Sequence, residues 1–182
     1  MARNTISRSL HDVGLAAWFG GTLANAVALN PAAGAVDDPH DAGAVANTGW
    51  DRWTPVNAAA IGAHVVGSVG QLAAHSGRAT RQQGVGEMVA VKTGLTVAAL
   101  GVTAYARQLG RTVSERTDVP AEAGTQPSAS TPADVAAAQK RLAALQWVVP
   151  ALTGALLVVS SYAGEQQRAS EQARGIRQRL VG

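Results

Sequence analysis

The chain has 182 residues, of which 47% are apolar and only 15% are charged. Low charge together with long apolar stretches excludes a largely disordered chain, and the absence of cysteine excludes a disulfide scaffold. A net charge of +3 without a basic cluster does not indicate a nucleic-acid partner. Neither a serine-hydrolase elbow nor a zinc-protease motif occurs, so no enzyme is predicted.

Four apolar segments occupy residues 10–29, 55–75, 88–106 and 142–163. Each contains about 20 residues, enough for a helix to cross a hydrocarbon core of about 30 Å. The sequence therefore predicts an all-α integral membrane four-helix bundle in one domain, 1–182. Two alternatives remain at this point: a soluble alanine-rich helical protein, and a cleaved signal peptide at the N-terminus, where basic Arg3 and Arg8 precede an apolar run.

The charges of the connections predict an orientation. Residues 1–9 and the tail 164–182 contain arginines, whereas the segment 30–54 is acidic, with Asp37, Asp38, Asp41 and Asp51. The positive-inside rule places both termini in the cytoplasm and the segments 30–54 and 107–141 outside. The predicted location is the cell inner (plasma) membrane.

The second outer segment has two parts. Residues 120–132 are rich in Pro, Ser, Thr and Ala and predict an irregular loop. Thr131 as N-cap and Pro132 at the first position then predict a helix that continues into the fourth span, with a kink at Pro150. Trp50 and Trp53, just before the second span, fit an interfacial aromatic belt.

Polar residues in the spans recur three, four or seven positions apart, which places them on one helix face. A polar group in hydrocarbon is costly unless it is paired, so these faces are expected to turn inward and meet. The members are His11, Trp18, Thr22 and Asn25; Asn57, His64, Ser68, Gln71 and His75; Lys92, Thr96 and Thr103; and Gln146, Thr153 and Ser160.

Depth in the bilayer predicts which polar residues pair. Asp12 and Lys92 lie near the inner face, and either they form an ion pair or Lys92 extends to the headgroups. Asn25 and Asn57 are expected near Gln146 toward the outer face. The same reasoning places His64 near mid-membrane, level with Gly21 or Thr22.

Three histidines are weak cofactor candidates. An intramembrane His64 can act as a hydrogen-bonded interface residue, a proton relay or a haem ligand. His11 and His75, both predicted at the inner end, form a weak pair for a metal or haem. No cofactor is predicted otherwise.

Two resemblances to membrane proteins follow from short strings. The first span, LHDVGLAAWFGG (10–21), resembles the opening of copper-resistance protein D-like membrane proteins, which implies copper or haem handling with His11 as the position carried over. The strings GWDRWTPVN (49–57) and QWVVPALTG (146–154) resemble an uncharacterised family of actinobacterial four-span membrane proteins. This second resemblance covers most of the chain.

The predicted function is that of a non-catalytic membrane protein, an accessory or structural subunit of a larger complex. Its expected partners are the lipid bilayer and other membrane subunits or a second copy of itself. The alternative is a small transporter, or a haem- or metal-handling protein, that uses the intramembrane histidines.

Overall fold

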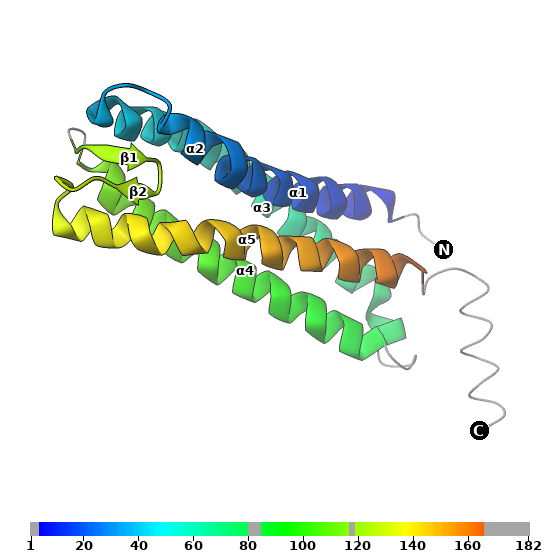
Figure 1. The fold of residues 1–182 in the computed structure, drawn as a ribbon. Helices are drawn as coiled ribbons and strands as arrows, with labels where there is room; N and C mark the ends of the chain where they lie inside the picture. The colour runs from blue at the N-terminus through cyan, green and yellow to red at the C-terminus, as the bar shows by residue number, and fades with distance from the viewer. Residues whose placement is uncertain (1–3, 80–84, 117–118, 166–182) are drawn as a thin grey trace.

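The computed structural model describes residues 4–79, 85–116 and 119–165, and this part of the chain is mostly helical (Figure 1). The predicted tail lies outside it from residue 166 onward, as does the 80–84 connection. The elements are α1 (Thr5–Ala24), the π-helical turn η1 (Asn25–Leu29), α2 (Asn30–Ala33), α3 (Pro39–Ala79), α4 (Val85–Ser114), β1 (Ala121–Ala123), β2 (Gln126–Pro127) and α5 (Ala133–Glu165).

Four helices are long and apolar enough to cross a membrane, by length and composition: Thr5–Ala33, Pro39–Ala74, Gly86–Ser114 and Ala133–Tyr162. Each covers all or all but the last residue of one of the four predicted spans and is longer than it. At 1.5 Å per residue, α3 with its 41 residues is about 60 Å long, whereas a hydrocarbon core is about 30 Å thick. A large part of α3 therefore extends beyond any bilayer that it crosses.

The predicted outer loops are in fact folded. Most of segment 30–54 is helical, because α3 already begins at Pro39. Within 120–132, β1 and β2 pair antiparallel, with Ala121 opposite Pro127, so the expectation of an irregular loop is wrong. Ala121 and Ala123 are buried, and this hairpin packs on α2, α3 and α5 at one end of the molecule, the hairpin end (Figure 1).

The start of the last helix is confirmed, whereas its predicted cap is not. α5 begins at Ala133, directly after Pro132. The Thr131 hydroxyl accepts from the Ser128 backbone N–H at 2.8 Å and donates to the Pro120 carbonyl, so it stabilises the loop before the helix. α5 continues past Pro150 to Glu165.

A π-helical turn keeps the buried residues of the N-terminal helix on one face. Thr22, Ala26 and Asn30 are all buried although they follow one another at spacings of four. In a regular α-helix, two such steps rotate the side chain by about 80° away from the face. The wider η1 turn absorbs this rotation, and Asn30 therefore points to the interior.

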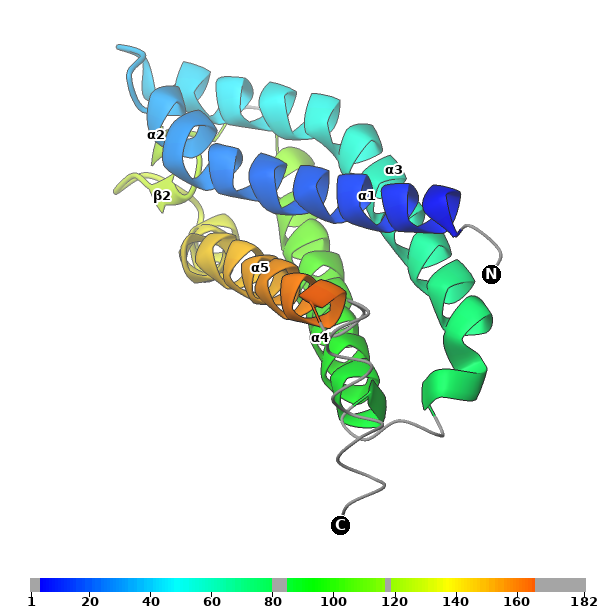
Figure 2. The ribbon, with the colours of Figure 1, turned by 90° about the vertical axis from the view of Figure 1, so that its right-hand side faces the viewer.

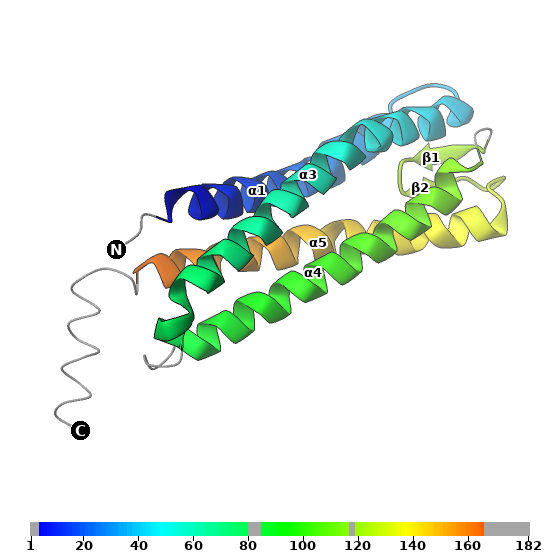
Figure 3. The same cartoon turned by 180° about the vertical axis from the view of Figure 1, so that it is seen from behind.

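The long helices associate as two pairs. α1 lies along α3, and α4 lies along α5 (Figures 2 and 3). Between the pairs, α1 also contacts α5, whereas α3 makes few contacts with α4. In the first pair the backbones approach closely at glycines. A Cβ on Gly14 would meet the carbonyl oxygen of Ala60 and the backbone nitrogen of His64. A Cβ on Gly67 would meet the backbone of Ser7 and of His11. Small residues of this kind permit close packing of membrane helices.

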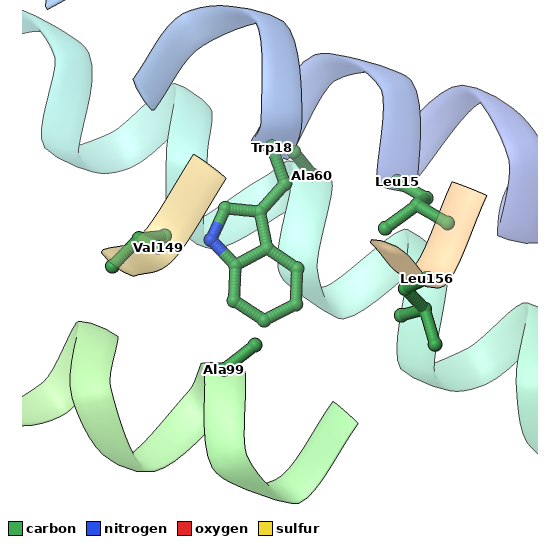
Figure 4. Close-up of a cluster of buried hydrophobic side chains, with 6 residues drawn as sticks. All are labelled: Leu15, Trp18, Ala60, Ala99, Val149 and Leu156. Atoms are coloured by element: carbon green, nitrogen blue, oxygen red, sulfur yellow. The ribbon is translucent and has the colours of Figure 1, made fainter. Parts of the chain in front are cut away.

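The apolar core joins the two pairs around one indole. Trp18 of α1 is fully buried and lies among Ala60 of α3, Ala99 of α4 and Val149 of α5 (Figure 4). Leu15 and Leu156 extend the same layer. Trp18 is thus an interior residue, as its position in the middle of the first span predicts.

The polar faces turn inward, as their spacing predicts. Every described member of the four faces is buried or half-buried, and His11, His64 and Thr153 are almost inaccessible. Apolar side chains occupy the outside instead: Val13 is 68% exposed, Val66 61% and Val97 63%.

The close approach of α1 and α3 can be tested by adding one methyl group. We expect Gly14→Ala to lower the free energy of unfolding by about 1–3 kcal/mol, because the new Cβ meets fixed backbone atoms. Gly62→Ala, on the open face of α3, is the matched control, since a Cβ there meets nothing within 4 Å. Both changes share the same gain in helix propensity. Equal thermal unfolding of the two variants in detergent would contradict the packing described above.

Candidate functional site

Two histidines from different helices meet at the end of the bundle where α1 begins. The rings of His11 and His64 have centroids 4.6 Å apart and planes tilted by 48°. His64 Nδ1 lies 3.3 Å from the His11 carbonyl oxygen, and His64 Nε2 lies 3.5 Å from the Thr96 hydroxyl. Both rings are buried, and His11 Nε2 has no hydrogen-bond partner. Sequence reasoning proposed both residues but did not bring them together.

The predicted level of His64 is wrong. It lies against His11 and Gly14, not beside Gly21 or Thr22. The edges of the apolar segments do not determine this level, because the register of α1 on α3 is fixed by the Gly14 and Gly67 contacts.

Charged residues lie next to the histidine pair. His11 Nδ1 is 2.7 Å from a carboxylate oxygen of Asp12, whose side chain is 63% exposed. Lys92, half-buried on α4, is within electrostatic range of Asp12, His11 and His64. In the described part of the chain no direct ion pair joins Asp12 to Lys92, although the two charges interact electrostatically, and the alternative in which Lys92 extends to the headgroups stays a prediction.

The histidine pair is a poor haem site as it stands. The two rings are in contact, which leaves no space for a porphyrin between them. The His75 side chain lies outside the described residues, so the predicted His11–His75 pair stays a prediction. Among the described residues, no group of three or more His, Cys, Asp or Glu side chains is placed to hold a metal ion.

A second polar cluster lies at the hairpin end and centres on Asn30. Its amide nitrogen donates to Gln146 Oε1 at 2.8 Å, and its amide oxygen accepts from the Trp50 indole N–H at 2.9 Å. Its backbone carbonyl accepts from the Gly124 N–H at 3.1 Å. Asn30 is only 2% exposed, so one buried residue ties α2 to α3, α5 and the hairpin turn.

The predicted partners of Gln146 are not the observed ones. Gln146 binds Asn30, while Asn25 Nδ2 and Asn57 Oδ1 are buried without partners. Gln71 is half-buried on α3. Asn30 is not among the predicted polar residues of the spans, because the first predicted span ends at Leu29. The signal that could have found it is its position four residues after Ala26, on the inward face.

A cavity of about 350 Å³ adjoins the Asn30 cluster, between the ends of α1, α3, α4 and α5. Asn30, Trp50, Gln146 and Gly124 form one wall. Trp53 lines the cavity too, with its indole ring on Gly21, where a Cβ would collide with it. Trp50 and Trp53 are therefore half-buried residues that line the cavity, and their place in an interfacial belt stays a prediction.

Comparison of the chain with protein-family models, with curated proteins and with solved structures finds no match. The geometry described above is therefore the basis for the function proposed below.

The Asn30 cluster makes a prediction about stability. Asn30→Ala leaves the Trp50 N–H and the Gln146 carbonyl oxygen buried without partners. We expect the free energy of unfolding to fall by about 2–4 kcal/mol, since each unpaired buried group costs about 1–3 kcal/mol. The measurement is denaturant unfolding in detergent.

Asn25→Ala is the matched control for Asn30→Ala, because the Asn25 amide nitrogen has no partner to lose. We expect it to change the unfolding free energy by less than about 1 kcal/mol. A similar loss in both variants would show that the Asn30 hydrogen bonds do not organise this end.

Proposed function

We propose that the chain is a multi-pass integral membrane protein of the plasma membrane, with both termini in the cytoplasm. We propose further that it is non-catalytic and acts as an accessory or structural subunit of a larger membrane complex, or as a homo-oligomer. The observation that carries this proposal is the low burial of its apolar helices. Only 6% of the apolar window of Gly86–Ser114 and 17% of that of Pro39–Ala74 is buried within the chain.

Such helices require an apolar environment that the chain itself does not provide. Monomeric soluble proteins rarely expose contiguous apolar patches larger than a few hundred Å². Here Val56, Val66, Val69 and Leu72 are all at least half exposed along α3 alone. Lipid tails or the helices of another subunit supply the missing contacts.

The two strings that resemble the actinobacterial four-span family meet in space. Trp50, from residues 49–57, and Gln146, from residues 146–154, both bind Asn30. We propose membership of that family on the resemblance of the two strings, and the shared cluster gives both of them a structural role in this chain.

The orientation can be tested with single cysteines, because the chain has none of its own. Glu122→Cys places an exposed thiol on the hairpin, and Thr5→Cys places one at the start of α1. In intact cells we expect a membrane-impermeant maleimide to label the first variant and to leave the second unlabelled until the membrane is permeabilised. The reverse pattern would invert the proposed orientation, and labelling of both in the aqueous fraction would contradict membrane insertion.

The subunit role can be tested by isolating the tagged protein from native membranes in mild detergent. We expect a membrane protein in stoichiometric amount, or a discrete homo-oligomer, when the eluate is analysed by mass spectrometry and by native mass measurement. A monomer that co-purifies with nothing in stoichiometric amount would contradict the role. Gly14→Ala, which disrupts the internal packing, serves as the comparison for loss by misfolding.

The histidine pair favours a second function, that of a small proton-coupled transporter. Asp12, His11, His64 and Thr96 follow one another from an exposed carboxylate through two buried rings to a half-buried hydroxyl, and ionisable residues within membrane segments often serve in proton relays.

The transporter function is tested in vesicles that contain the purified protein and a trapped pH dye. We expect proton flux under an imposed pH gradient, its loss in His64→Leu, and its retention in His40→Leu, since His40 is exposed on α3. Flux equal to that of empty vesicles would remove this function.

A further inference from the structure

Among the residues that line the cavity at the hairpin end, three polar side-chain atoms are buried and have no partner. They are Trp53 Nε1 and Asn57 Oδ1 of α3 and Thr103 Oγ1 of α4. A buried polar group without a hydrogen bond costs about 1–3 kcal/mol. A molecule that pairs with them recovers this cost.

The direction of each missing hydrogen bond limits the chemistry of the occupant. The indole N–H of Trp53 can only donate, and the amide oxygen of Asn57 can only accept. These residues are four positions apart on α3, so they are neighbours on one helix face. One hydroxyl group satisfies both, since it accepts from Trp53 and donates to Asn57, while Thr103 can do either. A carboxylate cannot donate, and an ammonium cannot accept.

The rest of the cavity favours an apolar ring. Two indoles, Trp50 and Trp53, line it together with Ile61, Leu100 and Leu145. Aromatic rings pack on one another in offset or edge-to-face arrangements. A volume of about 350 Å³ is within the range of small-molecule sites, about 300–1,000 Å³.

The charged residues near the cavity do not favour an ion. Arg107, which lines the cavity, lies 4.0 Å from a carboxylate oxygen of Asp51, so the two charges offset each other. The Trp53 ring is positioned in advance by its contact with Gly21, which lowers the cost of ordering the site on binding.

We propose that this cavity binds a small, neutral, lipophilic phenol, with the ring between the helices and the hydroxyl on Trp53, Asn57 and Thr103. The site is separate from the histidine pair and does not depend on the subunit role proposed above.

The binding experiment uses three brominated probes that differ in one group: a bromo-4-hexylphenol, its methyl ether and the corresponding bromohexylbenzene. Bromine quenches indole fluorescence at short range, and two of the four tryptophans line the cavity. The full chain is placed in lipid nanodiscs, and each probe concentration is corrected for partition into protein-free nanodiscs. We expect the phenol to bind at least about 10-fold more tightly than the hydrocarbon, with the ether in between, because about 1.4 kcal/mol of recovered hydrogen bonding corresponds to tenfold.

Two pairs of variants locate the binding. Gly110 lines the cavity, and a Cβ there meets nothing within 4 Å, so Gly110→Leu fills space without a backbone clash. We expect it to weaken phenol binding at least about 10-fold. Gly101→Leu, also on α4 with nothing within 4 Å of a Cβ, lies away from the cavity and leaves binding unchanged.

The second pair of variants distinguishes a hydrogen bond to the phenol hydroxyl from simple occupation of the cavity. Asn57→Leu removes the acceptor and is expected to abolish the preference for the phenol over the ether, whereas Asn25→Leu, remote from the cavity, keeps it. Equal affinities of the three probes would identify the cavity as a site for lipid chains and overturn the proposal. Quenching that Gly110→Leu does not change would show partition into the bilayer only, and would overturn it as well.

Discussion

The hydrogen bonds of Asn30 are the constraint on which the hairpin end depends. Its side chain and backbone together connect α2 with α3, α5 and the turn between β1 and β2. An amide buried at 2% exposure must have its partners, because the cost of an unpaired polar group rises as the surroundings become less polar. Since each partner comes from a different element, the cluster can be satisfied only when all of them are in place. The short hairpin, with five residues in strands, is therefore held by this cluster and by buried Ala121 and Ala123 rather than by its own two-stranded pairing.

The cavity is a consequence of the same arrangement. The Asn30 cluster fixes the separation of the helix ends, while small residues such as Ala46, Ala58, Ala104 and Gly110 face the space between them. α1 and α3 pack closely at Gly14 and Gly67. At the hairpin end the same helices cannot approach each other as closely. The result is an unfilled volume bounded by two indoles, whereas protein interiors are normally close-packed. A hollow maintained by directed hydrogen bonds is better explained by an occupant than by poor packing.

The sequence predicts the helices and their inward faces well, and the contacts between helices poorly. Apolar runs locate the four helices because length and hydropathy are local properties, and spacings of three, four and seven identify the faces because they depend only on the helical repeat. The π-helical turn at Asn25–Leu29 and the register set by Gly14 are not local properties. For this reason the sequence predicts the wrong level for His64 and does not predict the inward position of Asn30. The hairpin was missed because its strands, Ala121–Ala123 and Gln126–Pro127, are too short for a period-two pattern.

The Trp18 layer separates the two polar regions and bears on which function each can serve. Its indole is fully buried, packs on Ala60, Ala99 and Val149, and lies 6.1 Å from the His64 ring, measured between centroids. Val149 also lines the cavity, so the indole layer lies between the cavity and the histidine pair. A continuous path through the bundle therefore requires Trp18 to move, and transport would need a second conformation in which this layer opens. Ligand binding in the cavity does not require the Trp18 layer to open, because the cavity lies on one side of that layer. A probe that occupies the cavity without disturbing Trp18 would therefore separate ligand binding from transport through the bundle.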